Sequence, residues 1–331
     1  MKKVNNQGEY RAGDLATISY HLDLMLLRKN IKNLEKKHIS TVESNSTKVD
    51  MIVVGDSFSN GGGMGENNYY QDYIATYNDF TVLNILQLPD TNDFIETIVL
   101  LANSGYLKKH KVKHVLLETV QREALVRFAK DISYDIHSKE DILDKEIASV
   151  ANLYIDDVST HRKIQVINNL NNNAFLYNLK FMLKGYGSNK NYYIEKINQD
   201  LFTSKVPNEI IFIKHDIDRI IHENDENIQQ MNDNFNKLAD FLAKQNIELS
   251  VMVCVDKYTL YRKYISSHTY QKSVFFEKLK TLPKRYQFID TKEILVKELD
   301  KGVLDLYYPD DTHWSYKASE AIFKTIKFDK D

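Results

Sequence analysis

The sequence is poor in cysteine, proline and glycine, with one, four and eleven of them in 331 residues. A single cysteine rules out a disulfide within the chain. Cys254 lies in the apolar run 249–255, which predicts a buried, unreactive thiol. Few prolines and glycines leave little room for long linkers without regular structure. No apolar run approaches the roughly 18 residues that cross a bilayer, so the sequence predicts no membrane span within itself.

An excess of one charge is also missing. Lys and Arg number 44 and Asp and Glu number 46, for a formal net charge of −2. A sequence-independent nucleic-acid binder needs a basic field to displace counterions from phosphates, so no nucleic acid is expected as a partner. The length and the 43% hydrophobic content suit one large α/β domain or two ordinary ones, with a core that needs no disulfide or metal to stabilise it.

Short apolar runs alternate with amphipathic segments along most of the chain. The runs at 51–55, 81–86, 114–118, 249–255 and 286–289 predict buried strands, and helices are expected at 14–37, 92–109, 228–242 and 315–327. This alternation predicts the α/β class, with a doubly wound, mostly parallel sheet flanked by helices. Ligands of such a sheet bind at the carboxyl ends of its strands.

We expect a single catalytic domain over residues 1–331. Between 123 and 208 the alternation fails, and an Asn- and Tyr-rich stretch predicts a mainly helical insertion, with its clearest helix at 173–184. Such an insertion can extend the core or face the substrate as a lid, and the sequence leaves both open.

The first chemical motif is Gly55-Asp56-Ser57-Phe58-Ser59, which follows the first predicted strand and precedes a glycine-rich segment at 60–65. Its position puts a serine at the ligand-binding edge of the sheet, where peptide N–H groups near a helix start can face a developing oxyanion. The same residues also suit a plain helix cap. A phosphate-binding loop is disfavoured, because no Gly-Lys-Ser/Thr follows.

The second motif, at 307–315, holds two adjacent carboxylates and a histidine just before the last predicted helix. In an extended segment Asp311 and His313 project from the same side, so the carboxylate can hold Nδ1–H and leave Nε2 free as a base. In a helical turn Asp310 takes that place instead. The residues alone favour neither arrangement.

Together, the strand-end Gly-Asp-Ser and the later Asp-Thr-His-Trp resemble the motifs of the SGNH (GDSL-type) hydrolase superfamily. The forms Gly-Asp-Ser-Phe and Asp-Thr-His-Trp are similar to its alginate O-acetyltransferase branch, which includes bacterial cell-wall polysaccharide O-acetyltransferases. The resemblance covers roughly 48–122 and 247–328. It implies that Ser57 is the catalytic nucleophile, His313 the base, and Asp311 the carboxylate that orients His313.

A third segment, at 115–122, is similar to the strand of these acetyltransferases that ends in Glu and is followed by Arg. It implies substrate binding by Arg122, for which the alternative is a surface ion pair with Glu118 or Glu123. We add Gly62 and Trp314 as substrate-binding candidates. The Gly and Asn that many SGNH enzymes use as oxyanion donors are absent at 86–89 and 118–120. The oxyanion hole is therefore expected from the Ser57 N–H and the glycine-rich segment.

The resemblance implies an O-acetyltransferase that passes acetyl through Ser57 to a hydroxyl of a bacterial surface or cell-wall polysaccharide. The acceptor is then a polysaccharide, and a membrane-bound O-acyltransferase partner supplies the acetyl group. An extracytoplasmic location, with an anchor outside this sequence, is expected. An acetylesterase or a non-catalytic carbohydrate-binding protein are the alternatives.

No cofactor or metal is expected. His215 and His222 lie among acidic residues and could in principle bind a metal, but no recognised ligand spacing appears there. A solvated helix face is the favoured interpretation of that cluster.

Overall fold

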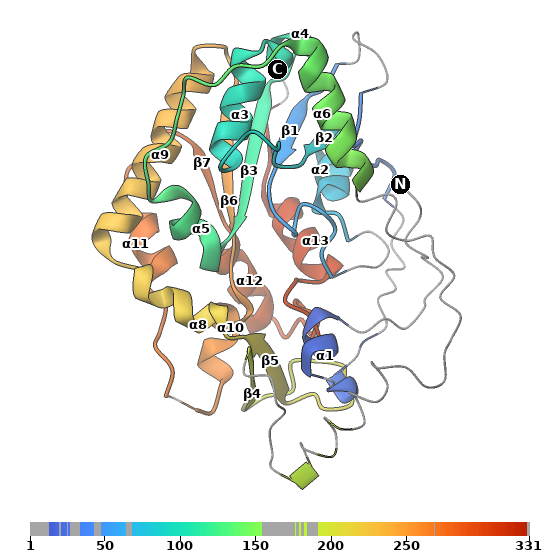
Figure 1. Cartoon of the computed structure of the whole chain (residues 1–331). Helices are drawn as coiled ribbons and strands as arrows, with labels where there is room; N and C mark the ends of the chain where they lie inside the picture. The colour runs from blue at the N-terminus through green and yellow to red at the C-terminus, as the bar shows by residue number, and fades with distance from the viewer. Residues whose placement is uncertain are drawn as a thin grey trace.

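The computed structural model describes residues 13–19, 21–24, 26, 34–42, 48–63, 68–153, 176, 179, 182–183, 191–267 and 269–329. Its centre is a five-stranded sheet in which every neighbouring pair is parallel, as Figure 1 shows. In spatial order the strands are β2 (Val82–Ile85), β1 (Met51–Val54), β3 (His114–Val120), β6 (Glu248–Cys254) and β7 (Gln287–Asp290). The α/β prediction with a parallel sheet is confirmed.

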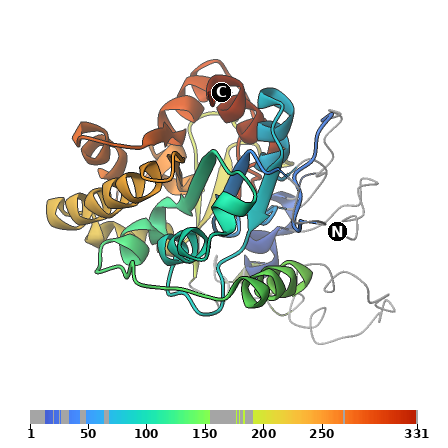
Figure 2. The same cartoon turned by 90° about the horizontal axis from the view of Figure 1, so that it is seen from above.

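Helices cover both faces of this sheet (Figure 2). One face carries α2 (Tyr70–Asn78), α12 (Thr291–Asp300) and α13 (Tyr316–Thr325). The other carries α3 (Phe94–Asn103), α5 (Gln121–Phe128), α9 (Asp225–Ala243) and α11 (Phe275–Thr281). Burial on both faces explains why the strands are continuous apolar runs rather than alternating ones. All residues of β1, β2 and β3 are buried.

The amphipathic helix expected around 228–242 is α9. Its apolar positions at spacings of three and four are all buried: Ile228, Met231, Phe235, Leu238 and Leu242. The Asn224 side chain accepts from the N–H of Asn227 and caps its first turn. By contrast, the helix expected at 92–109 is interrupted. Gly105, with φ +79°, separates α3 from α4 (Tyr106–Lys109).

The long helix expected at 14–37 is wrong for the described residues. α1 (Asp14–Ser19) and the short 3-10 turn η1 (Leu22–Leu24) are followed at 34–42 by extended chain. Ile39 pairs with the edge strand β2: its N–H donates to the Val82 carbonyl at 2.9 Å, and its carbonyl accepts from Asn84 N–H at 2.9 Å. Pairing with an open strand edge satisfies backbone groups that a helix would have satisfied internally.

The predicted insertion at 123–208 contains the C-terminal part of α5, an extended stretch at 129–139 and α6 (Glu140–Leu153). The helix expected at 173–184 falls almost entirely outside the described residues. Two strands that the sequence analysis did not predict, β4 (Tyr192–Lys196) and β5 (Glu209–Ile213), pair antiparallel. In Figure 1 this pair and α1 lie beyond the carboxyl ends of the central sheet.

Short elements complete the carboxyl edge of the sheet. They are α8 (His215–Asp218), η3 (Arg219–His222), α10 (Lys257–Tyr261) and η4 (Arg262–Tyr264). Across the described residues, no helix combines the length and apolar character needed to cross a membrane.

Candidate active site

Ser57 lies in the turn that follows β1, between the carboxyl ends of β1 and β3. The chain visits β2 on one side of β1 and then β3 on the other, so this is the point at which the strand order reverses. Ligands of doubly wound sheets bind at such switch points, because the loops there diverge and leave a crevice. The Ser57 side chain is exposed at this position.

The structure brings Ser57, His313 and Asp311 into one hydrogen-bonded chain. The distance from Ser57 Oγ to His313 Nε2 is 2.7 Å, and that from His313 Nδ1 to Asp311 Oδ1 is also 2.7 Å. Asp311 Oδ1 additionally accepts from the His313 backbone N–H at 3.0 Å. This is the geometry in which a carboxylate fixes the imidazole so that its other nitrogen can remove the serine proton.

Asp310, the alternative partner of His313, points elsewhere. It is fully buried, and its Oδ2 accepts from the Gly13 N–H at 2.8 Å. Of the two arrangements left open by the sequence, the structure adopts the one with Asp311 against the imidazole. We call residues 307–315 the histidine loop.

Lys257, the first residue of α10, supports the histidine loop from inside the protein. Its side chain is 1% exposed, and Nζ donates to the carbonyls of Tyr308 (2.8 Å), Pro309 (2.8 Å) and Asp311 (3.1 Å). Burial lowers the pKa of Lys257 to about 8, although Asp310 and Asp311 act in the opposite direction. A buried ammonium thus holds the backbone that carries the triad carboxylate.

The turn that carries Ser57 is held by a buried carboxyl at the end of β3. Glu118 Oε2 accepts from the N–H groups of Asp56 (3.0 Å) and Ser59 (3.2 Å) and from the Ser59 hydroxyl (2.7 Å). Burial, and after it the negative charge of Asp56, raises the pKa of Glu118 well above its ordinary value. Gly55 is required here, because a Cβ would lie 2.4 Å from Glu118 Oε2.

Cys254 donates its S–H to the second oxygen of Glu118 at 3.2 Å. Burial raises the pKa of this thiol well above its ordinary value. The thiol is therefore buried, as expected, and through Glu118 it helps to hold the turn that carries Ser57.

The Asp56 carboxylate pairs with Arg127 rather than with His313. The distance between Arg127 NH1 and Asp56 Oδ2 is 2.6 Å, and the same oxygen accepts from Val120 N–H at 2.9 Å. Burial alone would raise the pKa of Asp56, but Arg127 and the hydrogen bonds outweigh it and hold the pKa below its ordinary value. Asp56 therefore ties the turn to α5.

Gly62 has no side chain, and this leaves room for the His313 ring. A Cβ at this position would lie 2.2 Å from His313 Cδ2 and 2.4 Å from Nε2. The imidazole therefore packs directly on the backbone of the glycine-rich segment. Within the part of the chain that the structure describes, the Ser57 N–H has no hydrogen-bond acceptor, so it is available to an oxyanion.

A pocket of about 570 Å³ opens beside Ser57. It is lined by Gly55, Asp56, Ser57, Asn60, Gly61, Gly62, Leu86, Gln87, Phe94 and Val150. Leu86 and Gln87 come from the segment after β2, while Val150 comes from α6, within the predicted insertion. The insertion therefore contributes one wall of the pocket.

Trp314 does not reach this pocket. Its side chain is 1% exposed and packs edge-on against Phe58, whose ring also contacts His313, each at a centroid distance of 4.8 Å. Trp314 therefore packs behind the imidazole through Phe58, and its role in substrate binding stays a prediction.

Arg122 is held by two buried carboxylates. Its NH1 donates to Asp256 Oδ1 at 2.7 Å and lies 3.4 Å from Asp216 Oδ1. Burial would lower the pKa of Arg122, but Asp256 and Asp216 raise it above its ordinary value. The alternative interpretation named Glu118 or Glu123 as the ion-pair partner of Arg122, and the structure has Asp256 and Asp216 instead. Arg122 does not line the pocket beside Ser57, and its role toward a substrate stays a prediction.

The charges around His313 favour its protonated form. Burial works to lower the pKa of His313, but the Asp311 hydrogen bond and the charges of Asp311 and Asp14 outweigh it and raise the pKa above its ordinary value. Arg122 opposes this effect. An imidazolium forms during serine attack, so this electrostatic environment suits a general base.

Two of the acidic residues around His215 and His222 are engaged by other groups. Asp216 pairs with Arg122, and Glu223 accepts from the Ser273 hydroxyl and the Val274 N–H. Over the described residues, ligand atoms come within 4.8 Å of one another in one group of three, Asp14, Asp311 and His313. There His313 Nδ1 is already hydrogen-bonded to Asp311, so a cation would have to displace that bond.

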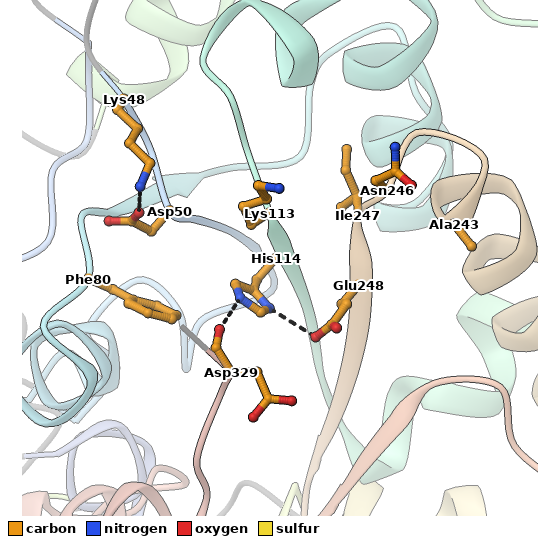
Figure 3. A pocket seen from close by; sticks show the side chains of 10 residues that line it. All are labelled: Lys48, Asp50, Phe80, Lys113, His114, Ala243, Asn246, Ile247, Glu248 and Asp329. Atoms are coloured by element: carbon orange, nitrogen blue, oxygen red, sulfur yellow. Dashed lines mark hydrogen bonds and ion pairs between the residues drawn. The ribbon is translucent and has the colours of Figure 1, made fainter. Parts of the chain in front are cut away.

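A second cavity, of about 340 Å³, lies at the opposite edge of the sheet. Figure 3 shows His114, at the start of β3, between the backbone of Asp329 and the Glu248 carboxylate, at 2.9 and 3.4 Å. Since neither Ser57 nor His313 lines it, this cavity is separate from the triad.

Sequence reasoning missed Lys257 and Asp14 as parts of the site. Lys257 comes two residues after the apolar run 249–255, so its place at the ligand-binding edge was a usable signal. Asp14 was visible only as the start of a helix, because its contacts lie almost 300 positions away.

The sequence matches no protein-family model, and no curated protein matches it.

Proposed function

We propose that the protein is a serine-dependent O-acetyltransferase with Ser57 as its nucleophile. The observation that carries the proposal is the continuous chain from Ser57 Oγ through His313 to Asp311, with both links at 2.7 Å. Two further features support it. The serine is exposed at the switch point of the sheet, and its N–H is free to bind an oxyanion.

In the first half-reaction, His313 Nε2 takes the Ser57 proton as Oγ attacks the carbonyl carbon of an acetyl ester. The bond from that carbon to the donor oxygen then breaks, and His313 returns the proton to the departing alcohol. Acetyl-Ser57 remains. In the second half-reaction, His313 takes a proton from the acceptor hydroxyl, whose oxygen displaces Ser57 Oγ, and the proton returns to Ser57.

The motif resemblance to SGNH enzymes of the alginate O-acetyltransferase branch supports the acetyl group and a polysaccharide acceptor as substrates. A pocket of about 570 Å³ is far larger than an acetyl group, and it leaves space for part of a sugar chain. Within this proposal, a membrane-bound O-acyltransferase supplies the acetyl group and the reaction takes place outside the cytoplasm. In this proposal, Arg122 contributes to substrate binding.

The test is a mass-spectrometric search for acetyl-Ser57 after incubation with 4-nitrophenyl acetate, with and without acetylatable oligosaccharides. Acetyl-Ser57 should form in the parent and be absent in Ser57→Ala, while Ser266→Ala, at an exposed serine distant in sequence, should behave as the parent. An acceptor should then gain acetyl while free acetate falls. Acetate release that no acceptor diminishes would indicate an esterase, and an unmodified Ser57 would refute a serine enzyme.

A further inference from the structure

The N-terminal segment 13–16 lies against the histidine loop. Gly13 N–H donates to Asp310 Oδ2 at 2.8 Å, and Ala16 N–H donates to the Asp310 carbonyl at 3.0 Å. Gly13 and Asp310 are 297 positions apart in the sequence. The segment therefore forms part of the wall behind the triad, although nothing in the local sequence links it to catalysis.

Asp14 contacts both residues that precede His313. Thr312 N–H donates to Asp14 Oδ1 at 2.7 Å, and the Thr312 hydroxyl donates to Asp14 Oδ2. In return, the Asp14 N–H donates to Asp311 Oδ2 at 3.3 Å. The Asp311 carboxylate is thus held on one oxygen by His313 and on the other by Asp14.

Asp14 also brings a second negative charge to the imidazole. Its Oδ2 lies 3.9 Å from His313 Nδ1, on the side already occupied by Asp311. Burial and the charge of Asp311 raise the pKa of Asp14, while His313 and the two Thr312 hydrogen bonds lower it. The net effect raises the pKa of Asp14 above its ordinary value, and the charged carboxylate is favoured first by His313 and then by the two donors of Thr312.

The charged groups near Asp14 come from several elements. The histidine loop contributes Asp310, Asp311 and His313, α10 contributes Lys257, and α8 contributes Asp216. Lys257 is the cation of this group, and it is engaged by three carbonyls of the loop. Arg122 of α5 acts on His313 and opposes Asp14.

We propose that Asp14 is a positioning residue of the triad: it holds Thr312 and the Asp311 carboxylate in register with His313, and its charge favours the imidazolium. The inference rests on the proposed role of Ser57. It makes the N-terminal segment a working part of the site rather than a covering of the sheet edge.

The expected pH effect has a definite sign. His313 must be neutral to accept the serine proton, so the rate falls on the acid side of its pKa. A negative Asp14 raises that pKa. Asp14→Asn keeps an oxygen acceptor for Thr312 but removes the charge, so the acid limb should move down by about 0.5 to 1 pH unit. The plateau rate should also fall, by roughly 3- to 30-fold, because the imidazolium is less stabilised.

The experiment measures the rate at which 4-nitrophenyl acetate acetylates Ser57 between pH 5 and 9, in EDTA, using the full-length chain. The control is Asp23→Asn, at an exposed carboxylate of η1 whose neighbour is Lys205 at 3.5 Å. Asp23→Asn should reproduce the parent profile. Asp14→Ala, which loses charge and acceptor together, should be slower than Asp14→Asn.

An Asp14→Asn profile that coincides with that of the parent would overturn the proposal while leaving the role of Ser57 intact. Absence of acetylation in the parent itself would instead remove the proposed function. Thr312→Val provides a second route should Asp14→Asn fail to fold. It removes the hydroxyl that holds Asp14 and should slow acetylation at least about threefold, since misplaced groups lose rate steeply; a parent-like rate would contradict the proposal.

Discussion

Neighbouring residues in the turn that carries Ser57 have different roles: Ser57 is the proposed nucleophile, and Asp56 and Ser59 hold the turn in place. Ser57 faces the pocket, whereas Asp56 turns to Arg127 and Ser59 turns to Glu118. The two supporting side chains are thus tied to α5 and β3, whose positions are fixed by the buried core. A serine held on such a rigid turn keeps its distance to His313 without ordering itself at each turnover.

Substituting the two adjacent aspartates one at a time should separate their functions. Asp311→Asn should lower the turnover of 4-nitrophenyl acetate by about 10³- to 10⁴-fold with the fold retained, because the imidazole loses its orienting carboxylate. Asp310→Asn should mainly lower the free energy of unfolding, by about 1 to 3 kcal/mol, because a buried charge facing Lys257 is lost. Steady-state kinetics and urea unfolding of both variants check this, and the reverse ranking of turnover would contradict the assignment of Asp311.

Among the elements, α10 supports the histidine loop although it is short. It has five residues, and its first residue bonds three carbonyls of the loop. The sequence predicted the strands of the central sheet because their continuous apolar runs require burial on both faces. It did not predict β4, whose residues are mostly half-buried, or its antiparallel partner β5, which follows a 12-residue connection (197–208). It also did not predict α10, because so short a helix has no periodic pattern.

Lys257→Met tests how α10 supports the loop. The variant leaves three buried carbonyls without their donor and should lower the free energy of unfolding by about 2 to 4 kcal/mol at pH 7. The unfolded chain binds the Lys257 proton more tightly than the folded chain, since burial lowers the folded pKa from 10.5 to about 8. The contribution of this group to stability therefore rises from pH 8 toward 10.5.

The parent minus Lys257→Met difference in unfolding free energy, measured by urea at pH 7.5 and 9.5, should accordingly increase with pH. Exposed Lys263, which pairs with Asp300, provides the control variant Lys263→Met, for which no loss of comparable size is expected. A difference that falls between the two pH values would show that Lys257 does not titrate as inferred.

Across the whole molecule, the two ends of the described chain lie at opposite edges of the sheet. Residues 13–16 contact the histidine loop at the carboxyl edge, whereas Phe328 and Asp329 contact His114 at the amino edge (Figure 3). The triad residues could be predicted because two short motifs carry them, and their spacing left Asp310 or Asp311 as alternatives. The contacts of Asp14 with residues almost 300 positions away could not, because the tertiary fold creates them and no local pattern records them.

This arrangement predicts that two substitutions with similar cost in unfolding free energy, one at each edge, differ in their effect on the acetylation rate of Ser57. Phe58 and Phe328 are both nearly buried, but Phe58 packs on His313 whereas Phe328 packs on Phe80 and His114. Phe58→Leu and Phe328→Leu should each lower the free energy of unfolding by about 1 to 2 kcal/mol. Only Phe58→Leu should also slow acetylation of Ser57 in the folded protein, because the imidazole loses its neighbour while the amino edge lies a full strand length from the triad. Urea unfolding and acetylation rates below the unfolding transition check both expectations. An acetylation rate lowered as much by Phe328→Leu would show that the two edges are coupled through the sheet.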